Sequence, residues 1–217
     1  MPEETLSKIK WLGHDGFQIR ANGVTLVIDP FQVKADEKAD IKADIILITH
    51  AHYDHCSPED IAKFVTPATV IVTEPESAAK IKEQKLCDDV RSMAPGDRLT
   101  VKEIPIEAVP AYNTDKNFHP KEKSWLGFII TVDGDRIYHA GDTDLIPEMS
   151  DLAVDIALLP VSGTYVMTSS EAVEAAKKIR PKVAVPMHFN AIVGSEDDAE
   201  AFKEALVGVC EVVILNA

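Results

Sequence analysis

The chain has 217 residues, of which 46% are hydrophobic and 27% charged, a composition typical of a globular protein and too apolar for a disordered one. Its 36 acidic residues outnumber its 22 basic ones, so the formal net charge is −14 at pH 7. Such acidity argues against a general nucleic-acid binder and against docking on anionic membranes, because both need a basic surface. We therefore expect one domain over residues 1–217 that acts on a small molecule, with no nucleic-acid or membrane partner and with homo-oligomers left open.

The sequence also indicates a cytoplasmic protein. Residues 1–10 are mixed polar and charged, and no stretch reaches the roughly 18 consecutive apolar residues that a membrane-spanning helix requires. The cysteines Cys56, Cys87 and Cys210 are widely spaced and odd in number, which is typical of reduced thiols.

Short apolar runs separated by turn signals predict strands and helices in the first half. Asn22-Gly23 is a type I′ hairpin signal. The run at 45–48 is wholly apolar, which predicts a strand buried on both faces. Ser57 followed by Pro58 predicts the start of a helix. The expected strands are 8–12, 17–21, 24–28, 45–48 and 69–73, and the expected helices are about 57–65 and 75–85.

The second half returns to β patterning before it alternates strands with helices. A capping box at Thr168 to Glu171 predicts a helix that ends near residue 179. The expected strands lie within 98–111 and at 126–132, 136–140, 155–159, 183–185 and 212–215, and a last helix is expected at 196–206. This order predicts an α/β protein of two loosely similar halves, with more hairpins than a simple doubly wound sheet needs.

The segment His50-Ala51-His52-Tyr53-Asp54-His55 directly follows the buried strand at 45–48. The carboxyl end of a buried strand is where α/β folds keep their sites. Imidazole and carboxylate together suit zinc, manganese or iron. Because four donors this close together cannot all face one ion with good geometry, two adjacent ions are the easier solution.

Several motifs that are far apart in the chain occur in an order that is characteristic of a known superfamily. They are 11–14 (WLGH), 27–30 (VIDP), the cluster of His50, His52, Asp54 and His55, 138–143 (YHAGDT), 159–165 (LPVSGTY) and 186–188 (PMH). Together they resemble the metallo-β-lactamase superfamily, specifically its short-chain branch of metal-dependent hydrolases that includes ascorbate-6-phosphate lactonase-like proteins. The resemblance covers almost the whole chain. It implies a four-layer αββα sandwich, in which two mixed β-sheets lie face to face with helices outside.

The resemblance also implies the roles of the donors toward two divalent metal ions. His50 and His52 would bind the first ion, Asp54, His55 and His188 the second, and Asp142 would bridge both. Zinc is the expected metal, and manganese or iron are the alternatives. Asp29 would lie behind the site and orient a histidine.

The chain departs from the superfamily at the third donor to the first ion. Many relatives have a histidine directly after the strand that ends here near residue 111, where this chain has Tyr112-Asn113. We expect His119 to take that place; the alternatives are a weak first site or help from His14.

Three further features complete the expectations. His139 lies three positions from Asp142 and is expected to be a core histidine facing the other way. Cys56 is expected to be a small buried filler. The loop 113–124 carries three lysines and two acids, and this locally basic character indicates an anionic substrate.

These features favour a metal-dependent hydrolase in which a metal-bound hydroxide attacks a carbonyl carbon or a phosphorus atom. Asp54 could orient the water, and His14 or His119 could protonate the leaving group. Lactones, phosphodiesters and thioesters are the candidate substrates.

Three alternatives are weaker. An RNA-processing nuclease of the same superfamily would need a basic arm, and a di-iron redox module would need a flavin-binding partner domain. A non-catalytic metal-binding protein is favoured only by Tyr112-Asn113.

Overall fold

A computed structural model describes residues 2–33 and 42–217 of the chain. In this part the strands form two mixed sheets, one of six strands and one of seven. The first sheet contains, in spatial order, β1 (Ile9–Gly13), β2 (Gly16–Ala21), β3 (Val24–Ile28), β4 (Ile45–Ile48), β5 (Val70–Thr73) and β6 (Asp89–Ser92). The second contains β13 (Glu211–Val212), β12 (Val183–Met187), β11 (Ile156–Pro160), β10 (Asp135–His139), β9 (Leu126–Val132), β8 (Ile104–Pro110) and β7 (Arg98–Val101).

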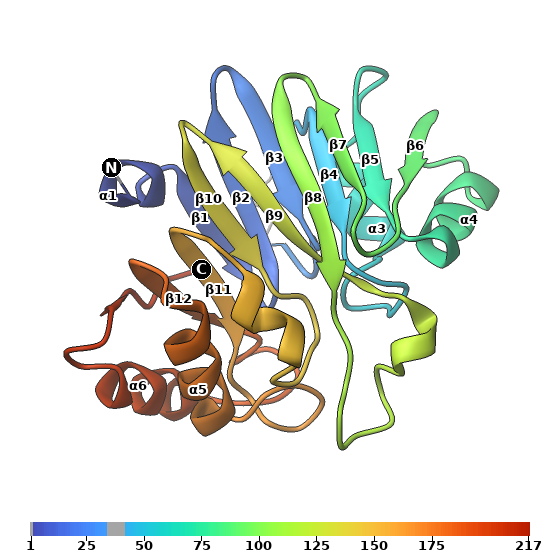
Figure 1. Ribbon diagram of the computed structural model, residues 1–217. Helices are drawn as coiled ribbons and strands as arrows, with labels where there is room; N and C mark the ends of the chain where they lie inside the picture. The colour runs from blue at the N-terminus through green and yellow to red at the C-terminus, as the bar shows by residue number, and fades with distance from the viewer. Residues whose placement is uncertain (1, 34–41) are drawn as a thin grey trace.

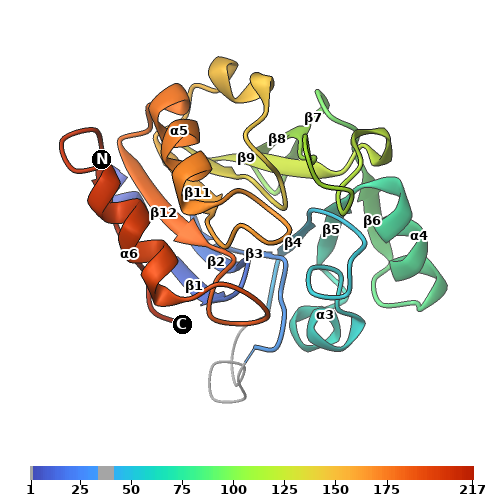
Figure 2. The same ribbon diagram turned by 90° about the horizontal axis from the view of Figure 1, so that it is seen from below.

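Four helices of the described residues cover the outer faces of the two sheets. They are α3 (Pro58–Phe64), α4 (Pro75–Glu83), α5 (Ser169–Ile179) and α6 (Glu196–Ala205). The short helix α1 (Pro2–Leu6) lies at the edge of the sheets (Figure 1), and 3₁₀ turns occur at Lys121–Lys123 and Pro147–Asp151. Helices α3 and α4 flank the first sheet, and α5 and α6 flank the second (Figure 2). This is the expected αββα sandwich. None of the helices in the described ranges combines the length and apolar character needed to cross a membrane.

Strand β4 shows why the sandwich has four layers. Its four residues are all buried, as the apolar run predicted. Ile45 and Leu47 belong to the core between the sheets, whereas Ile46 and Ile48 belong to the second cluster, under α3 and α4. A strand that is apolar on both faces must be covered on both faces, so the helices are required outside the sheets.

The local signals in the sequence explain several boundaries. Asn22 and Gly23 have φ values of 53° and 77°, as a type I′ turn requires. The Ser57 hydroxyl accepts a hydrogen bond from the backbone N–H of Asp60 at the start of α3. Thr168 and Glu171 form the predicted capping box of α5.

Some elements of the described residues were not predicted, among them the two 3₁₀ turns, and some were predicted too long, such as the helix expected at 75–85, which ends at Glu83. The helix α1 and the strand β6 are missing from the predicted set; β6 reads Asp-Val-Arg-Ser and is partly exposed, so it has no apolar pattern. It forms because it pairs in parallel with β5 at the edge of the sheet. The predicted strand at 212–215 is shortened to the two residues Glu211–Val212.

The carboxyl ends of β1, β3, β4, β8, β10 and β12 point to one end of the sandwich, the lower end in Figure 1. Two backbone hydrogen bonds join the sheets there. The N–H of His188 donates to the carbonyl of His14 at 3.1 Å, and that of Leu126 donates to the carbonyl of Thr49 at 3.1 Å. The loops that follow these strands are therefore held against one another.

Replacing Phe64 tests the packing of α3 on the first sheet. Its side chain is 1% exposed within the outer cluster, so Phe64→Ala is expected to lower the free energy of unfolding by about 3–5 kcal/mol. Urea unfolding followed by circular dichroism measures the change. Val207, which is 81% exposed, provides the control, and Val207→Ala is expected to stay within about 0.5 kcal/mol. Equal effects of the two changes would contradict this packing.

Candidate metal centre

The first group of donors is made of three imidazoles. His50 and His52 follow β4, and His119 comes from the loop between β8 and β9; one ring nitrogen of each lies within 4.8 Å of those of the others. The indole of Trp125 packs against all three rings, with centroid distances of 4.7, 4.7 and 5.5 Å. The structure thus brings His119 to the place where the sequence lacked a third histidine.

Asn113 fixes the position of His119. Its side-chain oxygen accepts hydrogen bonds from the backbone N–H of His119 at 2.9 Å and from ring atom Nδ1 at 3.1 Å. Its amide group donates to the carboxylate of Asp144 at 3.1 Å and to the carbonyl of Tyr165 at 2.9 Å. The residue that marked the departure from the superfamily is therefore the one that holds the replacement histidine.

The second group contains His14, Asp54, His55 and His188, whose donor atoms also lie within 4.8 Å of one another. Atom Nε2 of His14 lies 3.1 Å from the carboxylate of Asp54. His14 thus lies with the second group and not with His50 and His52: its ring centroid is 4.2 Å from that of His188.

Asp142 lies between the two groups, in the loop after β10. Its carboxylate oxygens are 3.1 Å from Nε2 of His119, 3.4 Å from Nε2 of His188 and 3.4 Å from Nε2 of His55. The side chain is thus in contact with a histidine of the first group and two of the second.

The charges at the centre shift the pKa values of its groups in opposite directions. Burial would raise the pKa of Asp142, but His55 and His188 outweigh burial and hold it well below its usual range. Burial would lower the pKa of His188, but the carboxylates of Asp142 and Asp15 raise it to about 9. Burial dominates at His50, whose pKa is well below its usual value. The centre therefore mixes neutral imidazoles with strongly paired ions.

Hydrogen bonds from behind orient the rings. Atom Nδ1 of His55 lies 2.8 Å from Asp29, which also accepts from the backbone N–H and the hydroxyl of Thr49 at 2.9 and 2.5 Å. Atom Nδ1 of His188 lies 2.8 Å from the hydroxyl of Ser162. Asp29 thus lies behind the site and contacts a histidine ring, as the resemblance implied. Because the Nδ1 atoms are engaged, the Nε2 atoms face the interior of the centre.

The backbone is strained where three of these residues lie. His14, Asp29 and His188 have φ values of 52°, 40° and 60°, in the left-handed region that favours glycine. Each follows the end of a strand, where the chain turns sharply; the side chains of His14 and His188 then point into the centre, and that of Asp29 supports His55 from behind. Non-glycine residues in this region persist only where the surroundings impose it, and they gather at functional sites.

The donors fit a divalent cation because their buried polar atoms lack partners. Atom Nε2 of His55, of His119 and of His188 makes no acceptable hydrogen bond, and neither does one carboxylate oxygen of Asp142. Buried polar atoms normally have partners, and imidazole nitrogens together with carboxylates are the donors that zinc, manganese and iron bind. A cation would supply the missing partner to all four atoms.

The sequence did not single out two residues of the centre. Trp125 packs against the first group, but nothing near it in the sequence is a metal-binding pattern. Asp15 lies in the turn between β1 and β2 and carries no recognised motif, yet it is completely buried and joins His55, Asp142 and His188 in a third group of donor atoms within 4.8 Å. Its position next to His14 was the available signal.

His139 and Cys56 have the structural places that the sequence predicted. His139 is buried, with Nε2 2.9 Å from the carbonyl of Asp15 and Nδ1 accepting from the N–H of Gly141. Cys56 packs in the outer cluster, where burial raises the pKa of its thiol to about 11. All three cysteines are free thiols.

The loop at 113–124 is less basic than its composition indicated. Lys116 pairs with Asp115 and Asp144, Lys121 with Glu148, and Lys123 with Glu76. Since each lysine is neutralised by a carboxylate, the loop does not present a cationic surface to a substrate.

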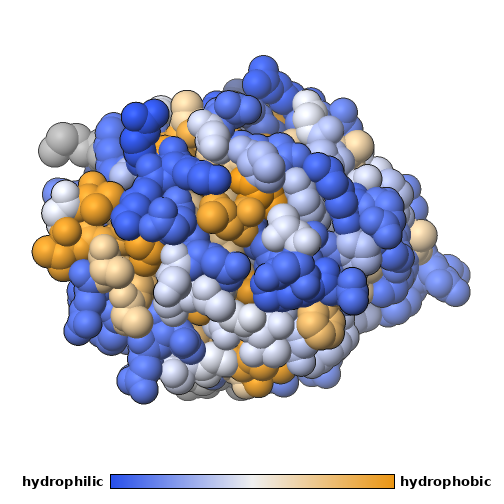
Figure 3. Space-filling view, turned by 60° about the horizontal axis from the view of Figure 1, so that its bottom comes forward, coloured by the Kyte–Doolittle hydropathy of each residue, from blue (hydrophilic) through white to orange (hydrophobic). Residues whose placement is uncertain are grey.

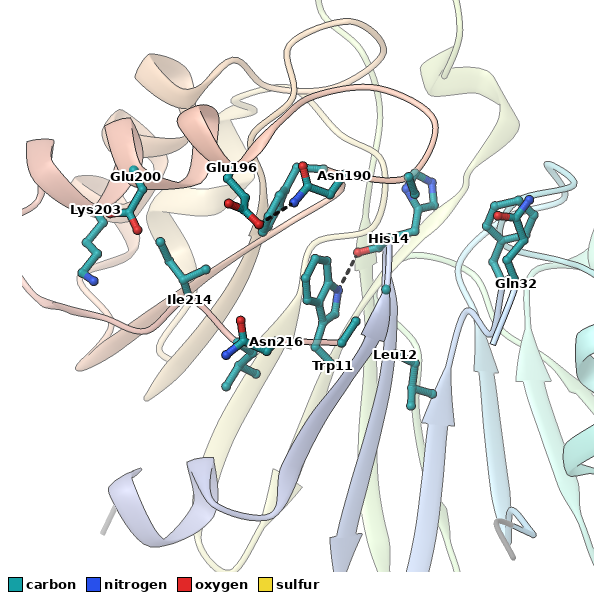
Figure 4. A pocket seen from close by; sticks show the side chains of 16 residues that line it. Trp11, Leu12, His14, Gln32, Asn190, Glu196, Glu200, Lys203, Ile214 and Asn216 are labelled. Atoms are coloured by element: carbon teal, nitrogen blue, oxygen red, sulfur yellow. Dashed lines mark hydrogen bonds between the residues drawn. The ribbon is translucent and has the colours of Figure 1, made fainter. Parts of the chain in front are cut away.

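A groove of about 670 Å³ opens beside the second group. Figure 4 shows its wall: His14 lies at the end of β1, with Trp11 and Asn190 on one side of it and Gln32 on the other. The C-terminal residues Ile214 to Ala217 and the side chains of Glu196, Glu200 and Lys203 complete the lining. His14 is therefore shared by the metal centre and the groove.

The surrounding end of the molecule is mostly polar with separate apolar patches (Figure 3). Tyr53, Phe118 and Ile192 are 67%, 49% and 38% exposed, and each lies within four residues of a donor in sequence. Single exposed apolar residues at the entrance are ordinary for a site that binds small molecules.

Comparisons with known proteins agree with this geometry. The family described as "Beta-lactamase superfamily domain" matches residues 8–188. UPF0173 metal-dependent hydrolases of Methanopyrus kandleri and Thermococcus onnurineus are 32% and 34% identical to the chain, each alignment covering 96% of both proteins. The solved structure of Igni18, a metallo hydrolase of Ignicoccus hospitalis, is 27% identical with a TM-score of 0.80, covering 96% of this chain and 94% of that one.

The αββα sandwich and its histidine–aspartate centre define the class of metallo-β-lactamase-fold enzymes. The chain belongs to the β-lactamase superfamily and, within it, to the UPF0173 family of metal-dependent hydrolases. The resemblance drawn from the sequence motifs is thus confirmed.

Replacing Asn113 tests how His119 is held. Asn113→Ala removes both side-chain hydrogen bonds to His119, and the affinity of the protein for its metal is expected to fall about 10- to 100-fold. Titration against a chromophoric chelator measures the affinity. Asn190→Ala is the control, because Asn190 is exposed and its amide donates a hydrogen bond to Glu196. An unchanged affinity in Asn113→Ala would show that the loop alone positions His119.

Proposed function

We propose that residues 1–217 form one hydrolase domain whose activity depends on two adjacent divalent cations. In this proposal His50, His52 and His119 bind the first cation, Asp54, His55 and His188 bind the second, and Asp142 bridges them. The position of Asp142 carries the proposal, since its carboxylate lies 3.1–3.4 Å from imidazole nitrogens of both groups. Zinc suits the first group best, because three imidazoles are typical of catalytic zinc sites.

Cations bound at such a centre supply a water-derived nucleophile near neutral pH and stabilise the negative charge that develops on the attacked group. The protein's own residues orient the reactants. Asp54 is partly exposed, at 13%, so its carboxylate can hold a water molecule by a hydrogen bond at the entrance. Asp29 and Ser162 keep the rings of His55 and His188 in place through Nδ1.

Of the two histidines considered for proton transfer, His14 is better placed. His119 has Nδ1 at Asn113 and Nε2 at Asp142, so neither ring nitrogen faces a substrate. His14 contacts Asp54 and lines the groove. We assign proton transfer to the leaving group to His14 and binding of the leaving group to the groove.

The substrate in this proposal is a small molecule with an electrophilic carbonyl carbon or phosphorus atom. A groove of about 670 Å³ is in the size range of small-molecule sites. Lactones, thioesters and phosphodiesters satisfy this description, and a negative charge on the substrate would be met by the cations rather than by the paired lysines of the loop. A cytoplasmic location is consistent with the three free thiols.

Replacing Asp142 tests the centre. Asp142→Ala is expected to lose bound metal and to lower hydrolysis by about 100-fold or more, because the two groups lose their common carboxylate. Metal content by elemental analysis and turnover of a panel of lactones, thioesters and phosphodiesters provide the readouts. Asp155→Asn, which lies at the other end of the sandwich against Lys182 and Arg136, is the control. A fully loaded, active Asp142→Ala protein would overturn the assignment.

A further inference from the structure

The carboxylate of Asp15 is buried without a partner. The residue is 0% exposed, and neither of its side-chain oxygens makes a hydrogen bond. Buried carboxylates are normally paired or bound to a metal, because removing an ionised group from water is costly. No hydrogen bond from the described residues offsets the cost of burying these two oxygens.

The turn between β1 and β2 directs Asp15 into the metal centre. Gly13 and His14 have φ values of 95° and 52°, two successive left-handed residues that reverse the chain sharply. Gly16 closes the turn so tightly that an added Cβ would lie 3.0 Å from the carbonyl oxygen of Gly13. His14 and Asp15 consequently both reach the second group, although they are neighbours in sequence.

Asp15 lies beside the second group, on the Nδ1 side of His55. Its Oδ2 lies 3.9 Å from Nδ1 of His55, and one of its oxygens is within 4.8 Å of a donor atom of each of His55, Asp142 and His188. Atom Nε2 of His188 and one oxygen of Asp142 also lack hydrogen-bond partners. A cation bound among these side chains would be a partner for the atoms that lack one.

We propose that Asp15 is a further metal-binding residue, and that its carboxylate strengthens the binding of an oxygen-preferring divalent cation such as Mn²⁺ in the second half of the centre. The inference rests on the proposed function, because it takes the two groups as metal sites. It adds a carboxylate that the superfamily motifs do not supply.

The two halves then differ in donor chemistry. The first has three imidazoles, His50, His52 and His119, and shares Asp142. The second has two imidazoles and, with Asp15, Asp54 and Asp142, three carboxylates. Carboxylate-rich sites with more than four donors suit manganese, whereas imidazole-rich sites with four donors suit zinc. One protein would accordingly hold two kinds of ion.

The test measures metal binding and not only activity. Metal-free wild-type protein is loaded with one equivalent of Zn²⁺ and titrated with Mn²⁺, and the free Mn²⁺ is counted by electron paramagnetic resonance. We expect one further equivalent of Mn²⁺ to bind to the wild type. In Asp15→Asn the dissociation constant for Mn²⁺ is expected to rise about tenfold or more, while the bound Zn²⁺ stays in place.

Two variants accompany Asp15→Asn. Asp15→Ser removes the carboxylate with a smaller side chain, so a folding defect of one variant does not decide the result. Asp135→Asn is the matched control, since Asp135 is also a buried aspartate, accepts a hydrogen bond from Thr5, and lies at the opposite end of β10 from the centre. Circular dichroism establishes that each protein is folded.

The outcomes separate the two proposals. A wild-type protein that binds neither ion would refute the two-metal function itself. Wild-type binding of both ions with unchanged Mn²⁺ affinity in Asp15→Asn and Asp15→Ser would overturn the role of Asp15 alone.

Discussion

The site depends on the carboxylate of Asp142, which faces imidazole nitrogens of both donor groups in an interior that excludes water. One negative charge cannot satisfy three imidazoles at once, and several of the nitrogens remain without partners. Burying such unpaired polar groups costs free energy unless bound cations become their partners. This end of the sandwich thus contains buried polar atoms that the polypeptide itself leaves without partners.

The cluster can form only where strands of both sheets end together. His50, His52 and His55 follow β4 of the first sheet, whereas Asp142 and His188 follow β10 and β12 of the second. The hydrogen bond from the N–H of His188 to the carbonyl of His14 fixes the distance between the two sets. Left-handed φ values at His14 and His188 then turn the side chains inward at the first residue beyond each strand. Rigid strands and strained ends together position the donors.

The sequence predicted those elements whose formation depends on residues close to one another in the chain. The apolar run at 45–48, the Asn22-Gly23 turn and the caps at Ser57 and Thr168 act through neighbouring residues, and each is present in the fold. Strand β6 was missed because it is partly exposed at a sheet edge and is formed by pairing with β5, which is a long-range contact.

The same distinction holds for the site. The motif from His50 to His55 is recognisable because its donors are close in sequence, and the order of the other motifs added Asp142 and His188. The place of His119 depends on hydrogen bonds from Asn113, and those depend in turn on Asp144 and Tyr165 from other loops. Asp15 stands between His14 and Gly16, and nothing in that short sequence marks it as a metal-binding residue. Only the packing of both sheets shows that its carboxylate is buried.

Each donor group draws on both sheets, and this links metal binding to the stability of the sandwich. The first combines His50 and His52 with His119 from the second sheet, and the second combines Asp54 and His55 with His188. A ligand that binds only the folded state stabilises it by mass action, by about 2.7 kcal/mol at a hundred times its dissociation constant. Because the donors converge only when the sheets lie face to face, cations bound at this end would hold the two layers together. Metal binding at the catalytic centre would therefore also stabilise the contact between the two sheets at this end of the sandwich.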